Sequence, residues 1–332
     1  MHPTVSVIVP CYNEQATIGL LLDALYAQTY PRERMEVIIA DGLSTDRTRE
    51  VIAEWQQAHP DLKVRVVDNS QRIIPAALNR ALAEAQGEII VRLDAHAVPA
   101  RDYVARSVEA LEAGRGDNVG GVWEIRPGGK GWIARSIAVA AAHPLGVGDA
   151  RYRYATQAAV VDTVPFGAFY RSLFDKIGKF DEHLLTNEDY EFNTRVRESG
   201  GTVWLDPSIR SAYFARPTLR ALARQYWRYG YWKVQMLRRY PHTLRWRQAL
   251  PPLFVLGLLL LGVGSLFWGW ARVLLALQIS LYALALLAAG IHTAVKRGDA
   301  ALAVGVPAAI AVMHLSWGAG FLWGLVHPPK SS

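Results

Sequence analysis

Residues Val5-Ser6-Val7-Ile8-Val9-Pro10 begin the pattern that decides the fold. The run is rich in β-branched residues and Pro10 ends it, which is typical of a strand buried in a parallel sheet. Helical periodicity follows over 16–28, where apolar side chains recur on one face. A strand followed by a helix is the repeating unit of α/β proteins.

The same unit recurs along the first hundred residues. Further strands are expected at 36–40, 64–67 and 89–93, and further helices at 46–57 and 75–85. Because strands and helices alternate at short intervals, the sequence predicts an α/β fold with a mostly parallel, Rossmann-like sheet flanked by helices. Later segments are less regular: 114–131 is glycine-rich and is expected to hold irregular β-structure, and 143–164 reads as a mobile loop.

Polar side chains follow each of these strands. In parallel sheets, ligands bind at the carboxyl ends of the strands. One polar turn could be an ordinary turn former, but four at one sheet edge predict a binding site. The four groups are Tyr12-Asn13-Glu14, Asp41, Asp68-Asn69 and Asp94-Ala95-His96.

The C-terminal part looks like membrane helix. The 332-residue chain has a net charge of +7, yet charges nearly vanish after Arg247. About 20 apolar residues span a bilayer as a helix, and 248–271 and 273–295 are uncharged. A third charge-free segment, 300–326, reads as a span, with a re-entrant or interfacial segment as the alternative. We expect spans at about 250–270, 273–294 and 301–325.

A basic, aromatic stretch precedes the first span. Residues 207–247 contain ten Lys and Arg residues and no Asp or Glu, with Tyr and Trp interleaved. Such a helix is typical of a surface that lies on anionic lipid. A solvated face is the alternative. Nucleic-acid binding is not expected, because the adjacent spans explain the charge and the aromatics together.

These features predict three regions: a catalytic domain (1–215), interfacial helices (216–247) and a transmembrane region (248–327). The basic flank places the catalytic domain in the cytoplasm by the positive-inside rule. No signal peptide is recognised at the N-terminus. We therefore expect a multi-pass protein of the inner (plasma) membrane.

Three motifs can carry chemistry. In Asp94-Ala95-His96, a carboxylate and an imidazole suit Mn²⁺ or Mg²⁺, although acid-x-His also occurs by chance. In Asn187-Glu188-Asp189, a carboxylate can act as a general base, or the acids can simply favour a helix N-terminus. Gln225 to Tyr229 could grip a diphosphate and a sugar, or could be part of the basic helix.

Taken together, these motifs resemble the inverting family 2 glycosyltransferases with a GT-A fold, over Val5 to about Tyr229. Asp41 to Thr48 resembles the family's D-G-x-S-x-D-x-T turn, and Asp94 stands where its D-x-D motif begins, with His96 replacing the second Asp. Asn187-Glu188-Asp189 resembles its base motif. Gln225 to Tyr229 resembles Q-x-x-R-W, with Tyr229 replacing Trp. The closest likeness is to ExoA-type succinoglycan glucosyltransferases.

The resemblance implies inverting, metal-dependent transfer of a hexose, glucose by this likeness, from a UDP-sugar to a polyprenyl-diphosphate saccharide in exopolysaccharide or cell-surface glycan assembly. Asp41 and Asp68 would hold the uracil, Asp94 and His96 the metal, and Asp189 would be the base. The implied catalytic residues are Asp189, Glu188 and Arg228, and the implied substrate-binding residues are Pro10, Tyr12, Glu14, Asp41, Asp68, Arg72, Asp94, Gln225 and Tyr229.

Three alternatives stay open at this point. A polyprenyl-phosphate sugar synthase would use the lipid phosphate itself as acceptor. A processive polysaccharide synthase would need a channel built from more spans than the sequence predicts. A non-catalytic membrane scaffold is disfavoured by the intact acids Asp41, Asp94 and Asp189.

Overall fold

The computed structural model describes residues 2–328, which form two compact units. Of the described residues, unit 1 comprises 2–124 and 151–213, and unit 2 comprises 125–150 and 214–328. Residues 125–150 therefore group with the C-terminal helices in unit 2, whereas the sequence analysis placed them within the catalytic domain.

A single mixed sheet has the strand order β3-β2-β1-β4-β8-β6-β9-β5, with β7 paired to β9. Strands β1 to β4 are parallel, as predicted, and β8 runs antiparallel to β4. The strands are β1 Val5–Cys11, β2 Met35–Asp41, β3 Lys63–Asp68, β4 Ile89–Arg92, β5 Val98–Pro99, β6 Asn118–Pro127, β7 Ala159–Val160, β8 Ala168–Tyr170 and β9 Val203–Ala215.

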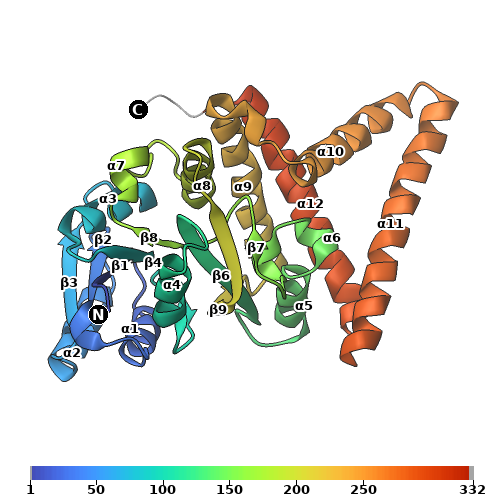
Figure 1. Ribbon diagram of the computed structural model, residues 1–332. Helices are drawn as coiled ribbons and strands as arrows, with labels where there is room; N and C mark the ends of the chain where they lie inside the picture. Colours follow the sequence, from blue (N-terminus) through green and yellow to red (C-terminus); the bar gives the residue numbers. More distant parts are fainter. Residues whose placement is uncertain (1, 329–332) are drawn as a thin grey trace. The chain divides into compact units, whose positions relative to one another are not determined.

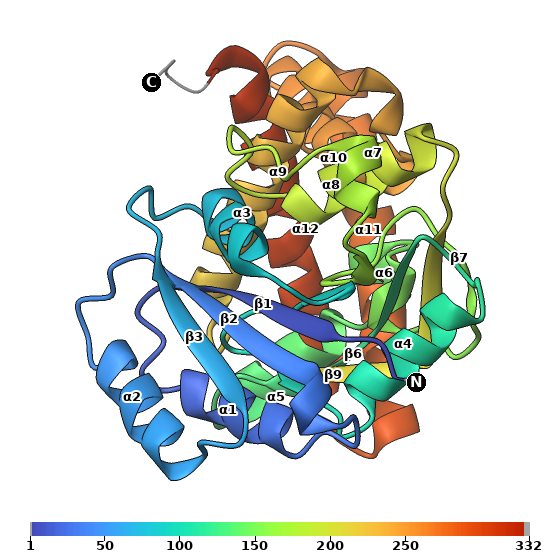
Figure 2. The ribbon, with the colours of Figure 1, turned by 60° about the vertical axis from the view of Figure 1, so that its left-hand side comes forward.

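Helices cover both faces of the sheet in unit 1 (Figure 2). Side chains of β1 alternate between two cores: Val7 packs with α1, α2 and α4, and Ile8 packs with α3 and α8. This is the two-sided burial that the β-branched run predicts. The helical segments of unit 1 are α1 Ile18–Tyr26, η1 Arg32–Arg34, α2 Thr48–Ala58, α3 Ile74–Glu84, α4 Tyr103–Glu112, η2 Arg151–Arg153, α7 Leu173–Ile177 and α8 Glu188–Glu198.

Two irregular segments have more structure than the sequence indicated. The glycine-rich stretch 114–131 contains the ten-residue strand β6. The expected loop 143–164 contains α6 (Pro144–Val147), η2 and β7. Strand β7 forms because it pairs with the distant strand β9. No local sequence pattern indicates this pairing.

Unit 2 is built around α12 (Leu302–Val326), which packs along α9 (Leu219–Arg239), as Figure 1 shows. Small residues permit this approach, because a side chain at Gly230 or Gly320 would collide with the backbone of the facing helix. The other helical segments of unit 2 are α5 Trp132–Ala140, α6, η3 Pro241–Thr243, α10 Trp246–Gly264 and α11 Gly269–Arg297.

Three helices, α10, α11 and α12, are long and apolar enough to cross a membrane. They overlap the three predicted spans and support a membrane protein. Helix α11 is mainly exposed: only 11% of its apolar 18-residue stretch is buried within the protein. The corresponding share in α12 is 44%. The difference arises because α9, α10, α11 and α5 all pack against α12.

Candidate active site

The centre of the candidate site is a buried arginine, Arg92, the last residue of β4, with 2% of its surface exposed. Its Nη1 lies 2.5 Å from Asp189 Oδ2. Its Nη2 lies 3.0 Å from both Asp94 Oδ1 and Glu188 Oε1. The guanidinium also lies over the Phe166 ring, 5.3 Å from its centroid. One cation thus gathers acids from two distant parts of the sequence, Asp94 after β4 and the adjacent pair Glu188 and Asp189.

The sequence analysis did not single out Arg92 as a site residue. A signal was present, because a charged residue ends the otherwise apolar strand Ile89–Arg92. Buried charges are usually paired. A buried arginine at a strand end therefore indicates that carboxylates converge there, although it cannot say which ones.

The turn before α8 brings two of the acids to this arginine. Asn187 adopts a left-handed conformation with φ of 73°, and Glu188 begins the helix directly after it. Asn187 makes no side-chain capping bond. Glu188 and Asp189 direct carboxylate oxygens at Arg92 instead. Glu188 and Asp189 therefore do more than favour a helix N-terminus, because each forms an ion pair with Arg92.

The electrostatics of the cluster favour a proton acceptor. Burial raises the pKa of Asp189 to about 8, with Arg92 opposing the rise and Glu188 and Asp94 adding to it. Burial also acts against the charge of Arg92, but the three carboxylates outweigh it and hold the pKa of Arg92 above its usual range. A carboxyl group that titrates near neutrality is suited to general base catalysis.

Asp94 and His96 form a pair of candidate metal ligands. His96 Nε2 lies 3.9 Å from Asp94 Oδ2, and His96 Nδ1 lies 3.0 Å from Glu14 Oε1. When Nδ1–H donates to Glu14, the lone pair of the ring lies on Nε2, the nitrogen that faces Asp94. Asp94 and His96 are therefore the residues that would hold a divalent ion here.

This donor set fits a divalent ion that is shared with a substrate. Among residues 2–328, no group of three or more His, Cys, Asp or Glu side chains is arranged to hold a metal. Mg²⁺ commonly takes one or two protein carboxylates and completes its shell with phosphate oxygens and water. Asp94 and His96 match that pattern, with one imidazole in place of a carboxylate.

Asp41 and Asp68, at the ends of β2 and β3, are joined by Arg49. Arg49 Nε donates to Asp41 Oδ2 at 2.6 Å, and its Nη2 lies 2.5 Å from Asp68 Oδ1. Asp41 is fully buried and also accepts bonds from the backbone and hydroxyl of Ser44. Asp41 therefore stabilises the turn that follows β2. The Asp68 side chain, by contrast, is 67% exposed. The sequence analysis did not identify Arg49.

Tyr12 and Arg72 form an exposed wall near these acids. Tyr12 is 44% exposed, and the Arg72 guanidinium lies 5.8 Å from its ring centroid. Pro10, the remaining predicted contact on this side, is buried within β1. Asn13, Leu43 and Arg72 have φ between 54° and 58°. Such strained non-glycine conformations cluster at functional sites, and here they follow three neighbouring strands.

The other predicted site residues, Gln225, Arg228 and Tyr229, lie on α9 in unit 2. Gln225 Nε2 donates to the Tyr229 hydroxyl at 2.9 Å. The Arg228 side chain is exposed. The spacing of this motif thus places an amide and a phenol in contact one helical turn apart.

Comparison with known proteins gives consistent results. The family described as Glycosyl transferase family 2 matches residues 6–178. The chain is 30% identical over 319 residues to succinoglycan biosynthesis protein ExoA from Rhizobium meliloti (strain 1021), covering 95% of this chain and 93% of that protein.

Two further relatives cover nearly the whole chain. A dolichyl N-acetyl-alpha-D-glucosaminyl phosphate 3-beta-D-2,3-diacetamido-2,3-dideoxy-beta-D-glucuronosyltransferase from Methanococcus voltae is 27% identical over 328 residues, 97% of each chain. The solved mannosyltransferase PcManGT from Pyrobaculum calidifontis, in complex with GDP-Man and Mn²⁺, aligns with a TM-score of 0.61 and 25% identity, over 94% of this chain and 87% of that one.

Proposed function

The chain belongs to glycosyltransferase family 2, and we propose that it transfers a hexose, with inversion, from a UDP-sugar to a saccharide carried on a polyprenyl diphosphate. The observation that carries the catalytic part is the contact of Arg92 with both Asp94 and Asp189. It links a candidate metal ligand to a candidate base through a single buried side chain.

Asp189 is the proposed base. With a pKa raised to about 8 by burial, it takes the proton of the acceptor hydroxyl more readily than an ordinary aspartate does. The hydroxyl oxygen bonds to the anomeric carbon as the bond from that carbon to the UDP oxygen breaks. One displacement inverts the centre, so that an α-linked donor gives a β-glycoside. Arg92 holds the carboxylate in place.

Asp94 and His96 would hold a divalent metal, Mn²⁺ or Mg²⁺, and Glu14 would orient His96 through Nδ1. When bound, such an ion neutralises the charge of a diphosphate. The complex of PcManGT with GDP-Man and Mn²⁺ supports this proposal.

The donor nucleotide is proposed to bind near the ends of β1, β2 and β3. Tyr12 offers an exposed ring, Asp68 an exposed carboxylate and Arg72 a cation for the base or a phosphate. Arg228, with Gln225, is proposed to stabilise the leaving UDP. A GDP-sugar is the second candidate donor, because the solved relative PcManGT binds GDP-Man.

A lipid-linked acceptor is supported by two observations. The M. voltae relative is named for a dolichyl-linked sugar phosphate, and ExoA for succinoglycan biosynthesis. Residues 2–328 also include three helices that are long and apolar enough to cross a membrane. We place the catalytic domain on the cytoplasmic side of the inner membrane, as the basic flank of the first span indicates.

The test uses the full-length chain in detergent. Release of nucleoside diphosphate is measured with UDP-glucose, UDP-galactose, UDP-N-acetylglucosamine and GDP-mannose, with Mn²⁺, Mg²⁺ or EDTA. Polyprenyl-diphosphate saccharides and polyprenyl phosphate are compared as acceptors. Transfer from a UDP-sugar to the former supports the proposal. Transfer only to polyprenyl phosphate, or no turnover with any donor, contradicts it.

A further inference from the structure

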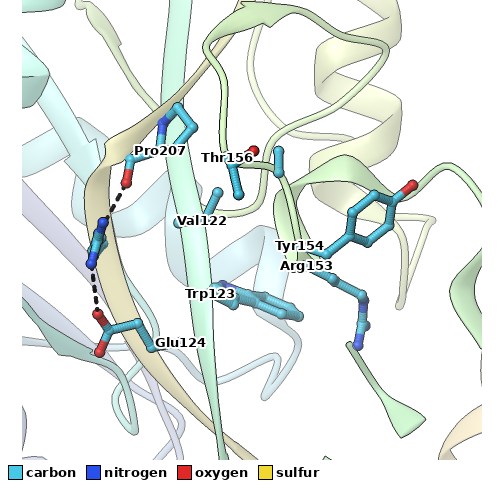
Figure 3. Close-up of a pocket in the computed structure, with 9 residues that line it drawn as sticks. Val122, Trp123, Glu124, Arg153, Tyr154, Thr156 and Pro207 are labelled. Carbon is cyan, nitrogen blue, oxygen red and sulfur yellow. Dashed lines mark hydrogen bonds and ion pairs between the residues drawn. The ribbon is translucent and has the colours of Figure 1, made fainter. Parts of the chain in front are cut away.

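A cavity of about 270 Å³ lies in unit 1, between β6, β9 and residues 153–156 (Figure 3). Strand β6 carries Val122, Trp123 and Glu124 along one wall. This volume is close to the lower end of ligand clefts, about 300 Å³. The side chains with most to offer a ligand are Trp123, Glu124, Arg153, Tyr154, Thr156 and Arg210.

The Trp123 ring forms a rigid platform in this wall. It stacks on Tyr213 with a centroid distance of 4.2 Å and an interplanar angle of 5°. It meets Tyr152 edge-on at 5.1 Å. Arg153, only 8% exposed, lies 5.0 Å from the Trp123 centroid. The indole Nε1 is buried and has no hydrogen-bond partner among residues 2–328. A fixed aromatic surface of this kind suits the apolar face of a sugar ring.

Polar groups in the cavity suit hydroxyls better than phosphates. Arg210 Nη1 lies 3.6 Å from Glu124 Oε1, and Arg210 Nε donates to the Pro207 carbonyl at 3.0 Å. The wall therefore offers a donor, an acceptor and the Thr156 hydroxyl within one small space. The Glu124 carboxylate offsets the charge of Arg210 and so weakens the attraction of Arg210 for a diphosphate, whereas a sugar hydroxyl can bond to both Glu124 and Arg210.

The strand register places the cavity beside the Arg92 cluster. Val91 of β4 pairs with Ala168, and Ala168 pairs with Val119 of β6. Since β6 therefore runs parallel to β4, Trp123, which follows Val119 within β6, lies toward the same end of the sheet as Asp94, which follows Val91. The rings confirm the proximity: Trp123 lies 5.8 Å from Phe166, and Phe166 lies 5.3 Å from the Arg92 guanidinium.

The strand order also separates the cavity from the proposed nucleotide site. Asp68 and Asp41 end β3 and β2, Arg92 ends β4, and β6 and β9 follow on the far side of β4. We propose that the cavity is a subsite for one sugar ring of the acceptor saccharide, stacked on Trp123. The proposal rests on the proposed function, because it assumes that Asp189 deprotonates an acceptor that is itself a saccharide.

Direct binding tests the subsite without requiring turnover. Methyl glycosides of glucose, galactose and N-acetylglucosamine are added to the full-length chain in detergent with UDP, and saturation-transfer NMR measures binding. We expect at least one probe to bind and Tyr154→Ala and Trp123→Ala to weaken it by about tenfold, the effect of roughly 1.4 kcal/mol. The control is Tyr170→Ala, because Tyr170 and Tyr154 are similarly exposed, at 39% and 36%.

Thr156→Val is a milder variant in case Trp123→Ala fails to fold, and it should also weaken binding. Unchanged binding in Tyr154→Ala and Thr156→Val, or no binding of any probe to the wild type, would overturn the subsite. Displacement of the glycoside by inorganic pyrophosphate alone would also overturn it. Donor hydrolysis without acceptor separates the two proposals: if hydrolysis occurs and the subsite fails, the proposed transferase activity stands.

Discussion

The guanidinium of Arg92 and the carboxylate of Asp189 meet at 2.5 Å, although 96 residues separate them along the chain. Arg92 ends a parallel strand, and Asp189 lies in the first turn of α8. This contact, with the one to Asp94, makes the position of the proposed base depend on the strand that presents the proposed metal ligand.

Arg92→Lys tests that dependence. Lysine keeps the charge, but its ammonium is a single point charge and cannot occupy both the Nη1 position that meets Asp189 and the Nη2 position that meets Asp94 and Glu188. We expect transfer to fall by about a hundredfold, as when a positioning contact near the reaction is lost, with UDP affinity nearly unchanged. Steady-state kinetics and calorimetry measure the two effects. Equal loss of UDP binding and turnover would indicate a purely structural role.

Asp189→Asn tests the base. The amide keeps the shape but cannot accept the acceptor proton, so transfer should fall by about 10²- to 10⁴-fold while UDP still binds. Glu198→Gln is the control, because Glu198 ends the same helix and is exposed. Wild-type turnover in Asp189→Asn would refute the assignment.

His96→Ala and Glu14→Gln test the metal pair. His96→Ala removes one candidate ligand, and Glu14→Gln weakens the bond that orients it. Loss of such an orienting bond typically costs about 10- to 100-fold in metal affinity. Electron paramagnetic resonance of Mn²⁺ with UDP measures this directly. His96→Asp should keep metal binding, and identical Mn²⁺ spectra for His96→Ala and the wild type would exclude His96 as a ligand.

Glu36 should make the stability of the folded protein decrease at acidic pH. Burial alone would raise the pKa of Glu36, but bonds from Ser6, the Gln86 backbone and Arg65 outweigh burial and lower it. Its stabilising effect is therefore complete above the unfolded pKa of about 4.3 and is lost as pH falls through the lower folded value.

Glu36→Gln should accordingly lower the midpoint of thermal unfolding at pH 7, and this difference should shrink as the pH falls below the unfolded pKa and through the lower folded value. Thermal unfolding of both proteins between these pH values measures the effect. A constant difference at all pH values would show that the ionised form of Glu36 is not what stabilises the fold.

Gly320→Leu tests the packing of α12 on α9. A side chain at Gly320 would strike the backbone at Trp227, so we expect the unfolding temperature of the membrane region to fall. Gly262→Leu in α10 is the matched control, since no atom lies within 4 Å of an added Cβ there. Equal unfolding temperatures for the two variants would contradict the close approach of the two helices.

Much of the fold could be predicted because its signals are local. The β-branched run at Val5 and the periodic helices after it depend on neighbours a few residues away, and β1 to β4 formed as expected. The apolar spans depend only on composition and length. By contrast, β9 was not predicted, and only irregular β-structure was expected where the ten-residue β6 forms, because both strands take their partners from distant strands.

The candidate site divides in the same way. The sequence alone determined the family, the chemical character of the strand ends and the identities of Asp94, His96 and Asp189 as candidates. Only the tertiary structure decided that Arg92 joins Asp94 to Asp189, that Glu14 meets His96 and that Asp41 is held by Arg49. The physical reason is the separation of the interacting residues along the chain. A charge can be buried only where opposite charges lie beside it, and the fold brings those partners together from distant parts of the chain.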